Sequence, residues 1–191
     1  PYMDYLLADS VLVPEGSQKF YSEKIAYLPS YQVNDRKRVI SEKVFTRSEL
    51  GLPEQGFVFC SFNNNYKILP AIFESWMRIL KTVEGSVLWL YEDNETAATH
   101  LRHEAEKRGV DPSRLVFAKH SPLADHLARH HSANLFLDTF PCNAHTTASD
   151  ALWAGLPVLT LMGQSFASRV AASLLTAIGL PRSEEHTSEL Q

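Results

Sequence analysis

The 191-residue sequence lacks long apolar runs, has few cysteines and carries little excess charge. Its purely apolar runs are only a few residues long, far below the roughly 20 residues that cross a bilayer, so we expect no membrane partner. The net charge of −4 predicts no nucleic-acid partner. The two cysteines, Cys60 and Cys142, could pair, but so few thiols are more typical of a reducing compartment, and we predict a cytoplasmic protein.

The two ends of the chain differ from the rest in composition. The chain opens on Pro1 within an apolar pattern and shows no signal peptide, and we expect the natural protein to be longer at both ends. Residues 182–191, RSEEHTSELQ, change abruptly to polar and resemble a translated sequencing adapter. We therefore predict a non-native polar tail over 182–191, with a genuine polar tail as the alternative.

Strand and helix patterns alternate from residue 57 onward. Short apolar stretches predict strands at 57–62, 86–91, 115–118, 134–138 and 158–161. Helical periodicity predicts helices from Pro70 to near Gly85 and over 96–108, 123–131, 146–154 and 167–178. Five such β–α steps predict an α/β fold, a Rossmann-like parallel sheet with helices on both faces. Ligands of these sheets bind at the carboxyl ends of the strands.

Residues 1–50 do not follow this alternation. They hold one apolar patch, a Pro/Gly/Ser stretch at 14–17 and a basic cluster at 36–38, while Thr46 and Glu49 could form the capping box of a short helix. Such a segment cannot form a core alone. We therefore predict that residues 1–50 are the end of a preceding amino-terminal lobe and a linker, and that residues 51–181 form the Rossmann-like lobe.

Small polar residues gather where the fourth predicted strand leads into its helix, in the stretch PCNAHTTASDALWAG at 141–155. Thr146 and Thr147 would open this helix, where unpaired backbone N–H groups and the helix dipole attract phosphate. Asp150, one turn later, could accept hydrogen bonds from a ligand hydroxyl such as that of a ribose. A plain capping box from Thr147 to Asp150 is the alternative, but the polar residues at 142–145 favour a ligand site.

Two further loops at the same edge supply complementary side chains. Residues 63–67, NNNYK, follow the first strand, and Lys67 could neutralise a diphosphate or simply be solvated. His126 and His130 are spaced for one helix face, which permits metal binding, but no acid or cysteine completes a ligand set, so we predict no metal. The histidine rings and Arg129 could instead stack on and hydrogen-bond to a base.

Four longer stretches closely resemble glycosyltransferase family 41, the O-linked N-acetylglucosamine transferases and their relatives. These stretches are FCSFNNNYKI (59–68), SVLWL (86–90), DTFPCNAHTTASDALWAGLPVLT (138–160) and FASRVAASLL (166–175). The resemblance covers about residues 3–180 and matches the carboxyl-terminal catalytic lobe of the family's two-lobed GT-B fold. It implies that residues 51–181 bind a nucleotide sugar, with UDP-N-acetylglucosamine as the first candidate.

The resemblance also implies an activity: inverting transfer of the sugar to Ser or Thr of an acceptor protein, with no metal or other cofactor. It implies Lys67 and His145 as candidate catalytic residues, with Lys67 on the diphosphate. The implied contacts of the nucleotide sugar are Asn64, Tyr66, Lys67, His126, Arg129, Cys142, His145, Thr146, Thr147 and Asp150.

Within this set the resemblance assigns each residue to one part of the donor. The two threonines would face the diphosphate and Asp150 the ribose. His126 and Arg129 would face the uracil. The residues that would border the sugar are Tyr66, Cys142 and His145.

Two departures from the family leave alternatives open. Its animal members carry Gln at the position of Asn64 and Lys at the position of Leu123, and some relatives use glucose or fucose donors. The amino-terminal lobe, which supplies acceptor contacts and usually follows tetratricopeptide repeats, is expected outside this chain, so we predict that the chain alone is inactive. The alternatives are a non-catalytic nucleotide-sugar-binding module or another GT-B enzyme, such as a nucleotide-sugar epimerase.

Overall fold

The computed structural model describes residues 3–32 and 35–180, so the predicted tail at 182–191 lies outside the described residues. Its main sheet has five parallel strands in the order β5-β4-β3-β6-β7. These are β3 (Val58–Ser61), β4 (Val87–Tyr91), β5 (Leu115–Ala118), β6 (Leu135–Leu137) and β7 (Val158–Leu159). The predicted strands are therefore confirmed, and most are shorter than expected.

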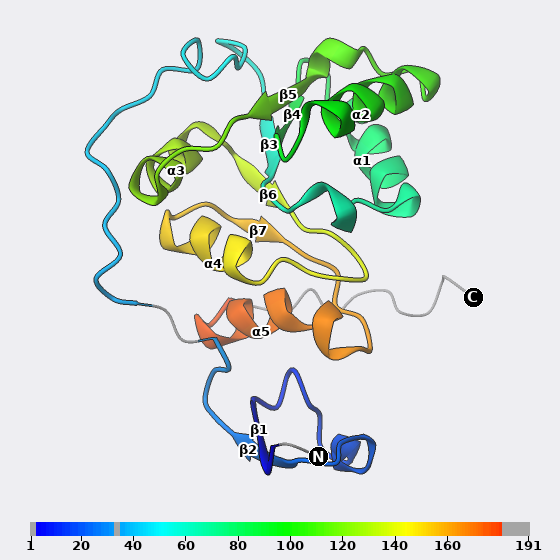
Figure 1. The fold of residues 1–191 in the computed structure, drawn as a ribbon. Coiled ribbons are helices and arrows are strands. Elements are labelled where there is room, and N and C mark those ends of the chain that lie inside the picture. The colour runs from blue at the N-terminus through cyan, green and yellow to red at the C-terminus, as the bar shows by residue number, and fades with distance from the viewer. Residues whose placement is uncertain (1–2, 33–34, 181–191) are drawn as a thin grey trace.

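In the described residues five α-helices connect or follow these strands, and Figure 1 shows how they are arranged. They are α1 (Pro70–Thr82), α2 (Glu95–Lys107), α3 (Leu123–Arg129), α4 (Thr146–Trp153) and α5 (Val170–Ala177). Pro70 stands at the first turn of α1, where a missing backbone N–H costs nothing. No helix in the described residues is long and apolar enough to cross a membrane.

The strands are buried on both faces because their alternate residues enter two different apolar clusters. Val58 and Cys60 of β3 join the cluster that also holds α4 and α5, whereas Phe59 joins the cluster that holds α1 and α2. On β4, Trp89 and Leu88 divide in the same way. Helices therefore cover both faces of the sheet, as predicted.

The strand order reverses between β3 and β6. From β3 the chain proceeds outward through β4 to β5, and from β6 it proceeds outward on the other side to β7. At such a switch point the loops at the carboxyl ends of the two central strands diverge and leave a crevice. Here these are the loops at residues 62–67 and 138–145, which hold much of the predicted site.

Two local predictions were wrong in detail. The helix predicted over 123–131 ends at Arg129, before a 3-10 turn at His130–Ser132. Thr46 and Glu49 do form the reciprocal hydrogen bonds of a capping box, but only turns follow them. Gly51, with a φ of 69°, lies in the left-handed region, which favours a turn over a continuing helix.

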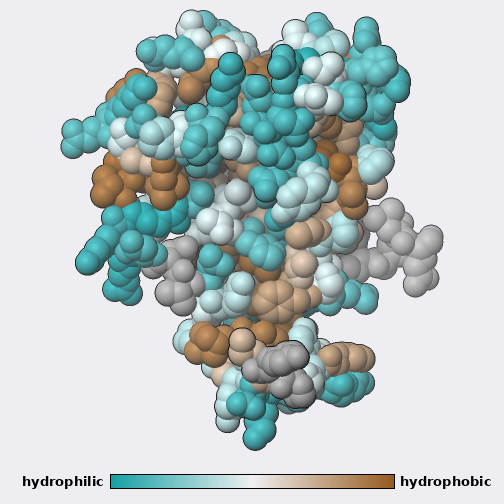
Figure 2. Space-filling view, viewed as in Figure 1, coloured by the Kyte–Doolittle hydropathy of each residue, from teal (hydrophilic) through white to brown (hydrophobic). Residues whose placement is uncertain are grey.

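The amino-terminal region forms a small unit that the sequence did not predict. Strands β1 (Tyr5–Ala8) and β2 (Lys24–Tyr27) pair in parallel, and the carboxylate of Asp9 accepts a 2.5 Å hydrogen bond from Ser173 of α5. Its apolar residues pack against α5, where Figure 2 shows hydrophobic side chains between the two parts. The buried apolar residues of this unit therefore share one cluster with Val170 of α5.

Candidate functional site

The loop after β6 is folded around one buried carboxylate. Asp138 Oδ1 accepts backbone hydrogen bonds from Thr139 (2.7 Å) and Ala144 (2.6 Å), and Oδ2 accepts one from the Thr160 hydroxyl (2.6 Å). Burial raises the pKa of Asp138 to about 6, although the three hydrogen bonds favour the charged form. Both oxygens are used within the protein, so Asp138 shapes the loop and offers no free oxygen to a substrate.

This loop brings the start of α4 next to Lys67, as the sequence predicted. Lys67 Nζ donates a 2.9 Å hydrogen bond to the carbonyl of Asn143. Thr146, the first residue of α4, is exposed, so its helix terminus is open to solvent. We call Lys67, the Asn143 carbonyl and residues 145–147 the anion cradle. It combines an ammonium with two donors to spare and the unpaired N–H groups of a helix start.

His145 stands at the N-cap position of α4, beside the ammonium. Burial, and then the positive charge of Lys67, lower the pKa of His145 below its usual value. Its Nε2 atom is buried and has no hydrogen-bond partner in the described part of the chain. The neutral form of the His145 ring is therefore favoured, and one buried ring nitrogen has no partner among the described residues.

Thr146 and Thr147, for which the sequence predicted the same role, have different environments. The Thr147 hydroxyl donates a 2.6 Å hydrogen bond to Asn63 Oδ1, and Asn63 Nδ2 donates in turn to Thr139 Oγ1 at 3.0 Å. Thr147 thus joins α4 to the loops after β3 and β6, and its proton is not free for a ligand. Thr146 is left as the exposed hydroxyl of the cradle. Asn63 is a buried residue whose role sequence reasoning missed.

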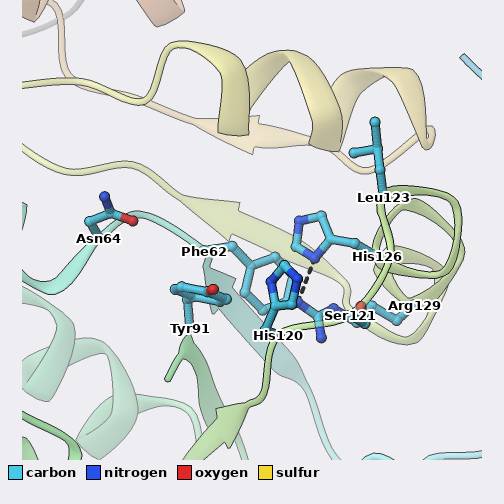
Figure 3. A pocket seen from close by; sticks show the side chains of 8 residues that line it. All are labelled: Phe62, Asn64, Tyr91, His120, Ser121, Leu123, His126 and Arg129. Carbon is cyan, nitrogen blue, oxygen red and sulfur yellow. Dashed lines mark hydrogen bonds between the residues drawn. The ribbon is translucent and has the colours of Figure 1, made fainter. Parts of the chain in front are cut away.

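A pocket of about 280 Å³ lies beside the cradle, at the ends of β3, β4 and β5. Figure 3 shows its side chains, with Asn64 and Tyr91 on one side and the α3 residues on the other. We call it the aromatic pocket. Its lining residues are Phe62, Asn64, Tyr91, His120, Ser121, Leu123, His126 and Arg129.

His126 and Arg129 form a fixed pair in this pocket. Arg129 Nη1 donates to the Lys119 carbonyl at 2.7 Å, and Nη2 lies 2.5 Å from His126 Nδ1. Burial, and then the charge of Arg129, lower the pKa of His126 to about 3. Because a guanidinium can only donate, Nδ1 accepts and the ring proton lies on Nε2. His126 therefore offers a donor, while the buried Arg129 orients it.

Different residues of the loop after β3 contribute to the aromatic pocket and to the cradle. Phe62 and Asn64 line the aromatic pocket, whereas Asn63 and Lys67 bond to the elements of the cradle. The Phe62 ring also makes a T-shaped contact with Trp89, with centroids 5.0 Å apart. The pocket and the cradle are thus held next to each other by one short segment.

Three other predicted residues take different positions. Tyr66 is 73% exposed and lines neither region. Cys142 is half-buried, and its Sγ lies 4.0 Å from the Asn143 carbonyl, at the edge of the cradle. Asp150 is buried and forms an ion pair with Arg38, which the sequence marked only as part of a basic cluster. The predicted ribose contact of Asp150 therefore has to coexist with a guanidinium.

The described residues contain no group of three or more His, Cys, Asp or Glu side chains that could hold a metal ion. His126 and His130, which the spacing allowed as ligands, meet as T-shaped rings with centroids 4.8 Å apart. His130 Nδ1 lies 2.7 Å from the His126 carbonyl. One ring nitrogen of each histidine is thus already engaged within the protein.

Comparison with known proteins relates this geometry to a family. The family model described as glycosyl transferase family 41 matches residues 36–188. A protein from Arabidopsis thaliana, named a probable UDP-N-acetylglucosamine–peptide N-acetylglucosaminyltransferase SEC, is 40% identical over 185 residues, which are 94% of this chain and 19% of that protein. A UDP-N-acetylglucosamine–peptide N-acetylglucosaminyltransferase from Caenorhabditis elegans is 43% identical over 136 residues, 71% of this chain and 12% of that protein.

A solved structure gives the same result for the fold. A lysine-to-methionine mutant of the Thermobaculum terrenum O-GlcNAc transferase superposes with a TM-score of 0.80 at 31% identity, covering 93% of this chain and 34% of that one. The chain spans about a fifth or less of the length of the two relatives named above. The predicted fold, a Rossmann-like lobe of a GT-B glycosyltransferase, is confirmed, and the chain belongs to glycosyltransferase family 41.

Proposed function

We propose that this chain binds the nucleotide-sugar donor of a protein O-glycosyltransferase. The donor is UDP-N-acetylglucosamine, and the sugar is transferred with inversion to Ser or Thr of an acceptor protein. The names of the relatives support this substrate pair. The observation that carries the proposal is the position of the Lys67 ammonium beside the open start of α4, next to a pocket lined by rings.

In this proposal the anion cradle holds the diphosphate. Lys67 and the first N–H groups of α4 donate to phosphate oxygens, and the Thr146 hydroxyl adds one donor. During transfer the bond between the sugar and the diphosphate breaks as the acceptor oxygen attacks the opposite face. Negative charge then grows on the leaving diphosphate, and the fixed positive groups of the cradle stabilise it. His145, at the N-cap, borders the reacting sugar and orients it.

The aromatic pocket holds the base in the same proposal. The Nε2–H group of His126 donates to a carbonyl oxygen of uracil, and Arg129 keeps the ring in that tautomer. Phe62 and Tyr91 supply apolar contact for the base. The ribose joins the two regions and meets Asp150. Cys142 lies at the edge of the cradle and borders the sugar there.

The alternative of a nucleotide-sugar epimerase is less well supported. Such an enzyme moves a proton at the sugar and requires a free acid or base. Both oxygens of Asp138 accept hydrogen bonds within the protein, from its own loop and from Thr160, and Asp150 is paired with Arg38. We propose that the acceptor site and the general base come from elsewhere in the enzyme, so that this chain alone binds donor without transferring sugar. Both cysteines are free thiols, which supports the proposed cytoplasmic location.

Calorimetric titration of UDP, GDP and UDP-N-acetylglucosamine into the chain tests the proposal. UDP and its sugar should bind, and Lys67→Ala should cost about 1.5–3 kcal/mol, roughly ten- to a hundredfold in affinity. Lys24→Ala, an exposed lysine on β2, is the matched control and should leave the affinity unchanged. Unchanged affinity in Lys67→Ala would remove Lys67 from the site. Absence of UDP binding would refute the donor assignment.

A further inference from the structure

The segment that leads from the amino-terminal unit to β3 touches two helices of the site. Arg38 Nη2 donates to Asp150 Oδ1 on α4. Three residues later, the Ser41 N–H donates a 3.1 Å hydrogen bond to the Ala124 carbonyl on α3. In Figure 1 residues 35–57 run along the outside of the sheet domain. Residues 38–41 therefore connect the helix of the cradle to the helix of the aromatic pocket.

The contact between Arg38 and Asp150 is a buried ion pair. The two side chains keep 11% and 8% of their surface exposed. Removing two charges from water costs several kcal/mol per ion, so a pair of this kind adds little to stability over two apolar residues. Asp150 Oδ2 receives no hydrogen bond from the described residues. A buried carboxylate with one oxygen held and one oxygen available is arranged to accept a further donor.

The ion pair lies between the two halves of the proposed donor site. Asp150 follows Thr146 by four residues, which places the two side chains on the same face of α4. The charge of Arg38 contributes to lowering the pKa of His126, so the guanidinium also lies near the aromatic pocket. In a nucleoside diphosphate the ribose is the group that lies between the base and the phosphates.

We propose that Arg38 is a positioning residue for the donor. It holds one oxygen of Asp150 so that the other accepts hydrogen bonds from the ribose hydroxyls. The inference rests on the proposed function and adds to it a residue from the connecting segment. It also predicts that Arg38 acts on the nucleoside part of the ligand and not on the diphosphate.

Calorimetry with three ligands separates these parts. The ligands are UDP, 2′,3′-dideoxy-UDP and inorganic pyrophosphate, titrated into the unmodified chain and into Arg38→Ala, Arg38→Lys and Arg36→Ala. We expect Arg38→Ala to weaken UDP about tenfold and to change the affinities for dideoxy-UDP and pyrophosphate by less than twofold. Arg38→Lys should recover part of the UDP affinity, because it restores a cation. Arg36, an exposed residue of the same basic cluster, should show no effect.

The outcomes distinguish the two proposals. If the unmodified chain binds UDP and Arg38→Ala leaves its affinity unchanged, the inference is wrong and the proposed function stands. If Arg38→Ala weakens pyrophosphate as much as UDP, Arg38 acts on the whole fold and the inference is also wrong. If the unmodified chain binds no UDP, both the proposed function and the inference about Arg38 are wrong. If Arg38→Ala does not fold, Arg38→Lys and the charge-neutral double variant Arg38→Ala/Asp150→Asn replace it. The double variant should bind UDP and dideoxy-UDP with the same affinity.

Discussion

The anion cradle and the aromatic pocket lie at the same edge of the sheet but are built in different ways. In the cradle the charged groups keep spare hydrogen-bonding capacity: Lys67 spends one donor on Asn143, and the start of α4 is open. In the pocket the charged group is bound within the protein, because Arg129 donates to the Lys119 carbonyl and to His126 Nδ1. The cradle can therefore bind a charged group of a ligand, whereas the aromatic pocket has a fixed shape.

This difference assigns the two regions separate tasks in recognition. Charge-assisted hydrogen bonds to phosphate contribute affinity for any nucleotide diphosphate, because every such ligand carries the same group. A rigid pocket with one oriented donor discriminates between bases, because a ligand that cannot match it leaves a polar group unpaired. We therefore expect changes in the cradle to alter affinity and changes in the pocket to alter choice of base.

The largest effect that separates the regions should come from Asp138. Asp138→Ala leaves three donors without an acceptor, two N–H groups in the loop after β6 and the Thr160 hydroxyl after β7, and we expect it to lower the free energy of unfolding by about 3 kcal/mol. UDP affinity should fall with it, since the loop positions the cradle. Urea denaturation and calorimetry measure both. Asp138→Asn keeps an accepting oxygen and should lose less; equal losses in the two variants would mean that the hydrogen bonds are not the cause.

Lowering the pH should reduce stability more through the aromatic pocket, at His126, than through the cradle. The pKa of His126 is about 3 in the folded protein and near 6.5 when unfolded, so only the unfolded chain binds a proton between these values. The stabilisation is therefore complete above pH 6.5 and is lost as the pH falls. From pH 7 to pH 5 we expect His126 to account for about 2 kcal/mol of lost stability.

Comparison with His126→Gln isolates this contribution. His130, whose pKa is lowered to about 4, acts in the same direction, and Asp138, whose pKa is raised to about 6, acts in the opposite one. Both remain in the variant. The urea midpoint of His126→Gln should therefore depend less on pH than that of the parent chain. Parallel pH profiles of the two proteins would contradict the assignment.

The smallest effect should separate Thr146 from Thr147. Thr147→Val leaves buried Asn63 without its donor and should lower the free energy of unfolding by about 1 kcal/mol. Thr146→Val, at the exposed position, should change stability by less than about 0.5 kcal/mol and weaken UDP binding severalfold instead. Thermal melting and calorimetry of the pair test this. The opposite pattern would exchange the roles of the two threonines.

Much of the fold follows from patterns along the chain. Every strand of the main sheet was predicted, because parallel strands buried on two faces are short apolar runs with sharp ends. The unit of β1 and β2 was not, since its strands are only half-buried and separated by fifteen residues without a regular pattern. Its pairing depends on docking against α5, a contact that no local pattern records.

The candidate site shows the same limit. Lys67 and Thr146 could be proposed from the sequence because the carboxyl ends of neighbouring strands must meet at one edge. Three features could not be predicted: Thr147 bonds within the protein, Arg129 orients His126, and Tyr66 is exposed to solvent. These assignments depend on which side chains from distant segments compete for the same hydrogen bond.

By itself, the sequence determined the layered α/β fold and which edge of the sheet holds the polar groups, because burial and periodicity are local properties of the chain. Only the tertiary structure decided which of those groups are free. Hydrogen bonds such as that between Asn63 and Thr147, and the ion pair between Arg38 and Asp150, join residues far apart in the chain. A donor or acceptor is available to a ligand only when no such partner has taken it, and partners are set by proximity in space.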